Sequence, residues 1–371
     1  MIATSAITVL TTAALTSSVG AKAPPHRATP LARLSLAQLS GQRIIYAYAG
    51  LNPPRTLIAR IREGEAAGVI FFAPNIASTA QLRATVAQLQ AANAASPVRA
   101  PLLMLVDQEG GLVNRLAGAP TLSEKQIGAS ANGEAVAAHA GASAARNLAS
   151  AGITVDLAPV LDVFRAPGNF IDEDQRSYSM NPAVVADLGG AFISELQRGG
   201  VAATAKHFPG LGAASASQNT DQVPVTLNVS LAMLRAVDEL PYQSAIAAGV
   251  KLIMLSWAVY PTLDPHLPAG MSPTIIGGEL RGRLHFQGVT ITDSIGAGAL
   301  ARFGGYAQRA ALAAQAGADL IICAVTNPAD NTPTEGIEAL DGIAAAIADH
   351  RLGRTMVEQA DQLVIAFRAQ P

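Results

Sequence analysis

Eight short apolar runs recur along this chain, and Ala-rich stretches with helical spacing lie between them. The runs are continuous rather than alternating, which is typical of strands buried on both faces of a parallel sheet. Eight such units predict an α/β protein with a (β/α)8 TIM barrel in a single domain over residues 35–371, and the alternative is a doubly wound open sheet. The runs are RIIYAYAG (43–50), GVIFFAP (68–74), PLLMLVD (101–107), TVDLAPVLDV (154–163), GVAATAKHF (200–208), KLIMLSW (251–257), GVTITD (288–293) and ADLIICAV (318–325).

A barrel of this kind carries its active site at the carboxyl ends of the strands. Asp107 ends the third run, Asp162 lies near the end of the fourth, Lys206 and His207 end the fifth, and Asp293 ends the seventh. An aspartate after a strand is also a common helix cap or turn former, so each one alone has a structural explanation. Their coincidence on one end of one barrel favours a functional site there.

The N-terminal segment differs in composition from the rest of the chain. Residues 1–23 form a mildly apolar run ending in Ala-Lys-Ala, which resembles a secretory signal peptide but lacks a basic start. Residues 24–34 are predicted to be a linker. The protein is therefore expected in the cell envelope or outside the cell, with a cytoplasmic location as the alternative. No apolar run is long enough to predict a transmembrane anchor.

Charge and metal-ligand spacing exclude several classes of partner. The net charge is −2 and the basic residues are not clustered, which argues against a nucleic acid or an anionic membrane as partner. The six histidines are scattered and the only cysteine, Cys323, lies in an apolar run, so we expect a buried thiol, no metal site and no cofactor. Protein partners are not indicated. Small neutral molecules therefore remain as candidate ligands.

Five segments carry polar residues at or near the predicted strand ends. They are VDQEGGLVNRL (106–116), LAPVLDV (157–163), DEDQRSYS (172–179), KHFPGLG (206–212) and TITDSIGAGAL (290–300). In this order and at this spacing they resemble glycoside hydrolase family 3, and most closely its single-domain β-N-acetylglucosaminidase (β-hexosaminidase) branch. The resemblance runs from about residue 40 to the end of the chain, and the first and fourth segments are its most specific signatures.

The resemblance implies retaining hydrolysis of a terminal β-linked N-acetylglucosamine through a covalent glycosyl-enzyme. Such chemistry needs one carboxylate as nucleophile and a second group that protonates the leaving oxygen and later activates water. Asp293 of TITDS matches the nucleophile of the family. Its place at a strand end would hold the carboxylate on a rigid element.

Five other residues match positions that contact the sugar in the family. Asp107 matches a carboxylate that accepts hydrogen bonds from adjacent hydroxyls, and Arg115 and Arg176 match arginines that help to hold them. Lys206 and His207 match a Lys-His pair that reaches the ring hydroxyls. Because only 4% of the residues are aromatic, a short pocket for one terminal sugar is more plausible than a long stacking groove.

The sequence departs from the family where the acid/base is expected. That branch usually carries an Asp-Ser-His triplet after the KHFPG segment, and the corresponding residues here are Ser217, Gln218 and Asn219. An amide cannot donate and retake a proton at neutral pH, so the expected dyad is missing.

Another group must therefore supply the proton if the chain is an active hydrolase. Asp221 is the first candidate, because a carboxylic acid is a suitable donor when burial or a neighbouring carboxylate such as Asp293 raises its pKa. Its alternative role is a turn or helix cap. Residues 172–174 (Asp-Glu-Asp) are further candidates, and His266 is a weaker one in a Pro-flanked segment.

Two more substitutions alter the expected rim of the site. Leu112 stands where the family has a second arginine, and Trp257 stands where it usually has a histidine. Trp257 is either a packing residue or an apolar platform that contacts a sugar face.

Three hypotheses follow. The favoured one is an exo-acting β-N-acetylglucosaminidase that acts on peptidoglycan-derived glycans. The second is a catalytically impaired relative that binds a sugar or muropeptide. The third is a Schiff-base enzyme that uses Lys206, which would leave the VDQEGG and TITDS segments unexplained.

Overall fold

The computed structural model describes residues 1, 31–326, 329 and 331–370 of the 371-residue chain. Its centre is a closed barrel of eight parallel strands in the order β1-β12-β11-β8-β7-β6-β3-β2. The barrel strands are β1 (Ile44–Tyr46), β2 (Gly68–Phe71), β3 (Leu103–Val106), β6 (Val155–Asp156), β7 (Ala202–Phe208), β8 (Leu252–Leu255), β11 (Val289–Ser294) and β12 (Leu320–Cys323). Seven of them lie within one of the apolar runs and β11 extends one residue beyond the seventh run, so the predicted barrel is confirmed and the open-sheet alternative is wrong.

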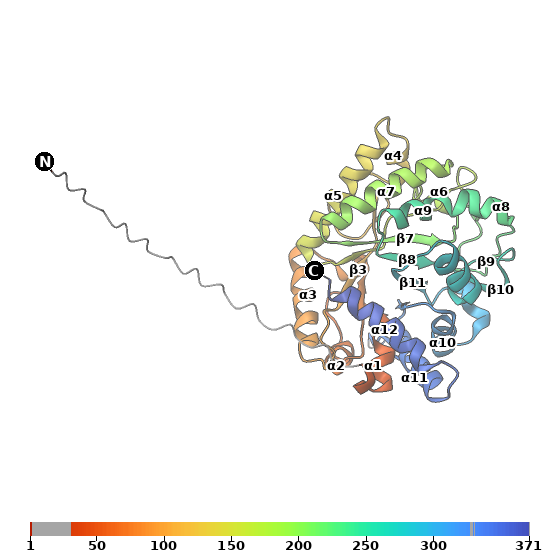
Figure 1. Cartoon of the computed structure of the whole chain (residues 1–371). Helices are drawn as coiled ribbons and strands as arrows, with labels where there is room; N and C mark the ends of the chain where they lie inside the picture. Colours follow the sequence, from red (N-terminus) through yellow and green to blue (C-terminus); the bar gives the residue numbers. More distant parts are fainter. Residues whose placement is uncertain (2–30, 327–328, 330, 371) are drawn as a thin grey trace.

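Helices surround the strands (Figure 1). The α-helices of six or more residues are α1 (Leu36–Gly41), α2 (Arg55–Glu63), α3 (Thr79–Asn93), α5 (Gly133–Ala151), α7 (Pro182–Arg198), α9 (Leu240–Ala247), α10 (Tyr306–Ala316), α11 (Thr334–Ala348) and α12 (Arg354–Arg368), and a π-helix spans Thr274–Arg283. Local sequence sets several of their ends. Ser35 caps α1 through the amide of Gln38, and Gly152 ends α5 in the left-handed conformation that glycine adopts readily. Within the described part of the chain, every helix is too short or too polar to cross a bilayer.

The barrel interior is a core of its own, built from apolar residues of the strands that are mostly two apart in sequence. Because side chains alternate across a strand, one set points inward and the other packs under the helices. Val364 of α12 belongs to the inner core and closes the amino end of the barrel. The inner set comprises Ile45, Ala47, Ala67, Ile70, Leu103, Leu105, Val155, Leu157, Leu252, Met254, Val289, Ile291, Leu320, Ile322 and Val364.

Short elements at the carboxyl end of the barrel shape the surroundings of the site. A two-stranded hairpin, β4 (Gln108–Gly110) and β5 (Val113–Asn114), follows β3, and a second one, β9 (Val259–Tyr260) and β10 (Asp264–Pro268), follows β8. The short helices α4 (Glu124–Gly128), α6 (Phe170–Glu173) and α8 (Leu231–Met233) lie in other connections.

The folded body begins before residue 35. Residues Leu31–Arg33 form a helical turn and Leu34 is buried in the core, so packed structure begins within the C-terminal part of the segment predicted to be a linker, residues 24–34. Leu31 and Leu34 are apolar side chains, and removing them from water favours packing of this segment against the core. The predicted signal peptide, residues 1–23, lies outside the described residues apart from Met1.

Candidate active site

A cavity of about 450 Å³ opens at the carboxyl end of the barrel strands. Its floor is the last layer of the inner core, formed by Ile70, Leu157, Met254 and Ile322. All the predicted site residues except Trp257 line this cavity, namely Asp107, Arg115, Arg176, Lys206, His207, Asp221 and Asp293. The volume falls within the usual range of small-ligand sites.

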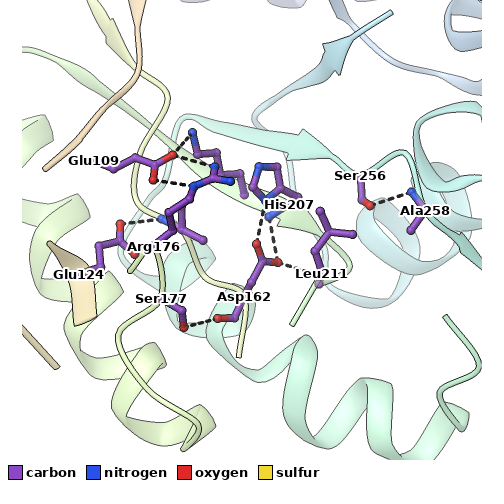
Figure 2. A network of polar contacts seen from close by, with 12 residues as sticks. Glu109, Glu124, Asp162, Arg176, Ser177, His207, Leu211, Ser256 and Ala258 are labelled. Carbon is purple, nitrogen blue, oxygen red and sulfur yellow. Dashed lines mark hydrogen bonds and ion pairs between the residues drawn. The ribbon is translucent and has the colours of Figure 1, made fainter. Parts of the chain in front are cut away.

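Lys206 and Arg176 are held in the cavity wall by two carboxylates. The Lys206 Nζ lies 2.8 Å from Asp107 Oδ1 and 2.7 Å from Glu109 Oε1. Arg176 donates through two nitrogens to the two oxygens of Glu109, each at 2.9 Å (Figure 2). This fork geometry fixes the guanidinium plane as well as its position.

The two cations also set the charge state of Glu109. Burial by itself would raise the pKa of Glu109, but the charges of Arg176 and Lys206 outweigh it and lower the pKa to about 2. Burial opposes protonation of Lys206, yet Asp107 and Glu109 raise its pKa above the ordinary value. Because imine formation needs a neutral amine, this protonated Lys206 argues against the Schiff-base hypothesis.

His207 is oriented from behind by Asp162. The His207 Nδ1 lies 2.7 Å from Asp162 Oδ2, and Asp162 Oδ1 accepts the backbone amide of Leu211 at 2.6 Å. Figure 2 shows the Asp162 carboxylate between His207 and Leu211. A carboxylate that binds one ring nitrogen fixes the orientation of the imidazole, so the other nitrogen of this cavity-lining side chain can serve a ligand.

Arg115 is less constrained than Arg176. Its backbone amide is bound by the Gln108 side chain, but among the described residues its guanidinium forms no ion pair. Since it lines the cavity, this side chain has donors available for a ligand. Leu112, at the tip of the β4–β5 hairpin, is 64% exposed and does not line the cavity.

The cavity brings two candidate catalytic carboxylates together. Asp293 lies near the end of β11, is half-buried, and accepts the amide of Ser294 at 2.7 Å. Asp221 lies at the exposed mouth, in the segment after β7. Desolvation at the cavity wall and the charge of Asp293 raise the pKa of Asp221, while His207 and Arg176 oppose the shift. Two carboxylates with different environments can divide the roles of acid and nucleophile.

Of the other acid candidates considered from sequence, only Asp174 lines the cavity. Asp172 is buried and bound to Lys125 at 2.7 Å, Glu173 is exposed outside the cavity, and His266 is exposed on β10 outside it. Asp174 lines the cavity, as does Asn219. The structure therefore favours Asp221 and Asp174 among the carboxylates considered from sequence.

Trp257 has a structural position. It is 1% exposed, does not line the cavity, and donates its indole N–H to the Ser294 carbonyl at 2.8 Å. Gly270 packs so closely on the indole ring that any side chain there would collide with it. The packing interpretation of Trp257 fits this geometry, and the sugar-platform interpretation does not.

Sequence reasoning missed the central role of Glu109 and the support that Asp162 gives to His207. A signal for Glu109 existed, because a spacing of two residues puts Asp107 and Glu109 on one side of an extended segment. No signal linked Asp162 to His207, since Asp162 lies in the segment after β6 and His207 lies in β7. Cys323 is buried as expected, and no cluster of three or more metal-ligating side chains occurs among the described residues.

A parallel eight-stranded barrel with two carboxylates in a cavity at the strand ends is typical of the barrel glycosidases. Residues 32–366 match the Glycosyl hydrolase family 3 N terminal domain. The chain is 42% identical over 345 residues to an uncharacterized secreted glycosyl hydrolase of Arthroderma benhamiae, covering 92% of this chain and 96% of that one. The chain therefore belongs to glycoside hydrolase family 3.

Further relatives narrow the family to one branch. A beta-hexosaminidase of Thioalkalivibrio sulfidiphilus is 34% identical over 78% of this chain and 80% of its own. A family 3 beta-N-acetylglucosaminidase from Paenibacillus superposes with a TM-score of 0.83 at 32% identity, over 90% of this chain and 62% of that one. The beta-N-acetylhexosaminidase of Beutenbergia cavernae superposes with a TM-score of 0.81 at 29% identity, over 91% and 99%. The chain is thus a glycosidase of the β-hexosaminidase type.

Proposed function

We propose that this protein is a retaining, exo-acting β-N-acetylglucosaminidase in which Asp293 is the nucleophile and Asp221 is the general acid/base. The observation that carries the proposal is that both carboxylates line one cavity together with Asp107, Lys206 and Arg176. In the first step Asp293 attacks the anomeric carbon while Asp221 protonates the departing oxygen. In the second step the Asp221 carboxylate takes a proton from water, which attacks the same carbon and releases Asp293.

The charges around the two carboxylates support this division of roles. The raised pKa of Asp221 favours the protonated form that a general acid needs. Asp293 receives a backbone hydrogen bond that holds its orientation at the strand end. The wall of paired cations and carboxylates offers both donors and acceptors, which suits the hydroxyls of a neutral sugar.

The first test compares two β-N-acetylglucosaminides, one with a nitrophenol leaving group and one with a simple alcohol. Asp293→Ala should abolish hydrolysis of both, by more than about 1,000-fold. Asp221→Asn should lower kcat/KM for the alcohol glycoside by about 100-fold or more and change the nitrophenyl glycoside much less, because a good leaving group needs little protonation. NMR of the first-formed sugar should show the β-anomer.

The alternative function is that of a sugar-binding protein without efficient turnover. Asn219 favours it, because an amide stands where the family resemblance leads one to expect the catalytic histidine. Wild-type protein that binds N-acetylglucosamine in a calorimeter but hydrolyses neither glycoside would establish this alternative and overturn the enzyme.

We further propose that the natural substrates are peptidoglycan-derived glycans and that the protein is exported. The apolar segment over residues 1–23 and the secreted relative from Arthroderma support export. Release of N-acetylglucosamine from purified muropeptides, compared with release from a disaccharide of N-acetylglucosamine alone, tests the substrate. N-terminal sequencing of the protein recovered outside the producing cell tests the cleavage.

A further inference from the structure

The turn that carries Asp221 is closed by the side chain of Asn219. The Asn219 Oδ1 accepts the backbone amide of Asp221 at 2.8 Å. The Asn219 carbonyl accepts the amides of Gln222 at 3.1 Å and Val223 at 3.0 Å. An asparagine that binds the backbone two residues ahead is a standard way to fix a turn. Asn219 therefore determines where the backbone of Asp221 lies.

The same turn is attached to the segment that follows β11. The amide of Gly298 donates to the Asp221 carbonyl at 2.7 Å, and the amide of Ala299 donates to the Thr220 carbonyl at 3.0 Å. Gly298 packs against the Gln222 carbonyl so closely that a Cβ at this position would collide with it. β11 carries Asp293. The backbone of Asp221 is therefore hydrogen-bonded to the segment that directly follows the strand of Asp293.

Together these contacts fix the relative position of the two carboxylates. The turn is held on one side by its own asparagine and on the other by Gly298 and Ala299, and Thr220 between them is buried. Proton transfer to a leaving group is sensitive to displacements of about 1 Å. A residue that fixes this turn can therefore influence proton donation without touching the substrate's reacting atoms.

Resting on the proposed function, we infer that Asn219 and Gly298 are positioning residues for the acid Asp221. Asn219 does not transfer a proton, since its amide has no titratable group near neutral pH. It acts by holding the amide of Asp221, and Gly298 acts by allowing the turn to approach the segment after β11. Asn219, at the position where the family resemblance leads one to expect the catalytic histidine, thus positions Asp221, the acid that takes over the role of that histidine.

The test uses the full chain and kcat/KM for the two glycosides described above, because this ratio reports the step in which the leaving group departs. Asn219→Ala should lower kcat/KM for the alcohol glycoside by roughly tenfold or more and for the nitrophenyl glycoside by less than about threefold. Asn219→Ser should restore most of the loss, because a serine hydroxyl can accept the same amide.

Gly298→Ala provides an independent variant with the same expected split between the two glycosides. Gly277→Ala is the matched control, because an added methyl group there meets no atom within 4 Å. Thermal unfolding of each variant separates a local change from loss of the fold. Equal losses on both glycosides, or no loss in either Asn219→Ala or Gly298→Ala, would overturn the inference.

The Asp221→Asn variant separates this inference from the proposed function. If Asp221→Asn shows the leaving-group split and the Asn219 and Gly298 variants do not, only the positioning role is wrong. If Asp221→Asn shows no split, the assignment of the acid itself is wrong and the positioning role is overturned with it.

Discussion

The two ends of the barrel both bury charged side chains, but they neutralise them differently. At the carboxyl end, Lys206 lies against Asp107 and Glu109, and Arg176 lies against Glu109, all in the wall of the cavity. Lysine has three donors and arginine five, so these pairs keep hydrogen-bonding capacity for a ligand. The ion pairs at the carboxyl end therefore hold the Lys206 and Arg176 side chains in fixed orientations toward the cavity.

At the amino end, buried arginines bind mainly to the backbone. Arg43 donates to the carbonyls of Ala318 and Asp319 just before β12, and Arg368 donates to Pro101 at 2.7 Å and to Ala100 at 3.0 Å just before β3. These contacts satisfy carbonyls at the starts of the strands and use the arginine donors for the fold. Under the proposed function, the charged pairs at the carboxyl end bind the sugar, whereas the arginines at the amino end close the barrel.

The largest expected effect tests whether Glu109 holds the binding surface together. Glu109→Gln leaves Arg176 and Lys206 with a buried excess of positive charge, which should cost about 3–5 kcal/mol in the free energy of unfolding. It should also lower kcat/KM by about 100-fold, because both cations lose their fixed position. Chemical denaturation and kinetics at neutral pH measure the two effects.

Glu124→Gln is the matched control for that change. Glu124 is as buried as Glu109, but burial and the charge of Glu109 raise its pKa well above the ordinary value, whereas the pKa of Glu109 is lowered. Its contact with the amide of Val160 can be kept by a glutamine oxygen. If Glu124→Gln were as damaging as Glu109→Gln, burial rather than charge would explain the loss.

The second prediction uses pH to compare the two ends. Burial raises the pKa of Asp361 on α12 to about 8 and that of Glu335 on α11 to about 7. Their folded-state pKa values lie above the unfolded ones, so the folded state binds more protons between about pH 4 and these values. The stability that these two groups contribute should therefore be greatest below that window and fall as pH rises through it.

Replacing each acid by its amide should remove part of that fall. Asp361→Asn should flatten the decline in unfolding free energy between about pH 5 and pH 8 by on the order of 2 kcal/mol, and Glu335→Gln should flatten it mainly below about pH 7. Only the Glu335 change should alter kcat/KM, because Glu335 binds the amide of the cavity residue Val325. An unchanged pH slope in both variants would contradict the prediction.

The third prediction concerns the closure of the amino end alone. Arg368→Met leaves the carbonyls of Ala100 and Pro101 without their donor and should destabilise the fold by about 1–3 kcal/mol. The control Arg354→Met removes an exposed pair with Glu358 on the same helix and should cost less than about 0.5 kcal/mol. Both variants should keep kcat/KM within about twofold. A large kinetic effect of Arg368→Met would mean that the two ends are coupled.

The sequence predicted the barrel because its signal is repeated and local. Each strand is a continuous apolar run, and residues such as Asp107 and Asp293 follow from the rule that chemistry lies at strand ends. The start of the fold at Leu31 was missed because a short apolar helical turn beside prolines resembles a linker.

The connections between the polar residues could not be predicted in the same way. That Arg176 pairs with Glu109, or that Asp162 holds His207, depends on how segments 67 and 45 residues apart in sequence approach one another. Local sequence patterns do not predict which of these distant segments come into contact. Asn219 illustrates the limit, since the family resemblance leads one to expect a histidine at this position, while in the structure the Asn219 side chain closes the turn that carries Asp221.

The smallest expected effect asks whether the carboxyl end also contains contacts that serve only the fold. Trp257→Phe removes the indole donor to the Ser294 carbonyl, beside Asp293, and keeps an aromatic ring against Gly270. Loss of one buried hydrogen bond should cost about 0.5–1.5 kcal/mol in the free energy of unfolding. Because Trp257 lies outside the cavity, KM should not change and kcat should fall by less than about threefold. If instead KM rose severalfold with stability unchanged, Trp257 would contact the sugar. Trp257 would then be a binding residue of the carboxyl end rather than a packing residue.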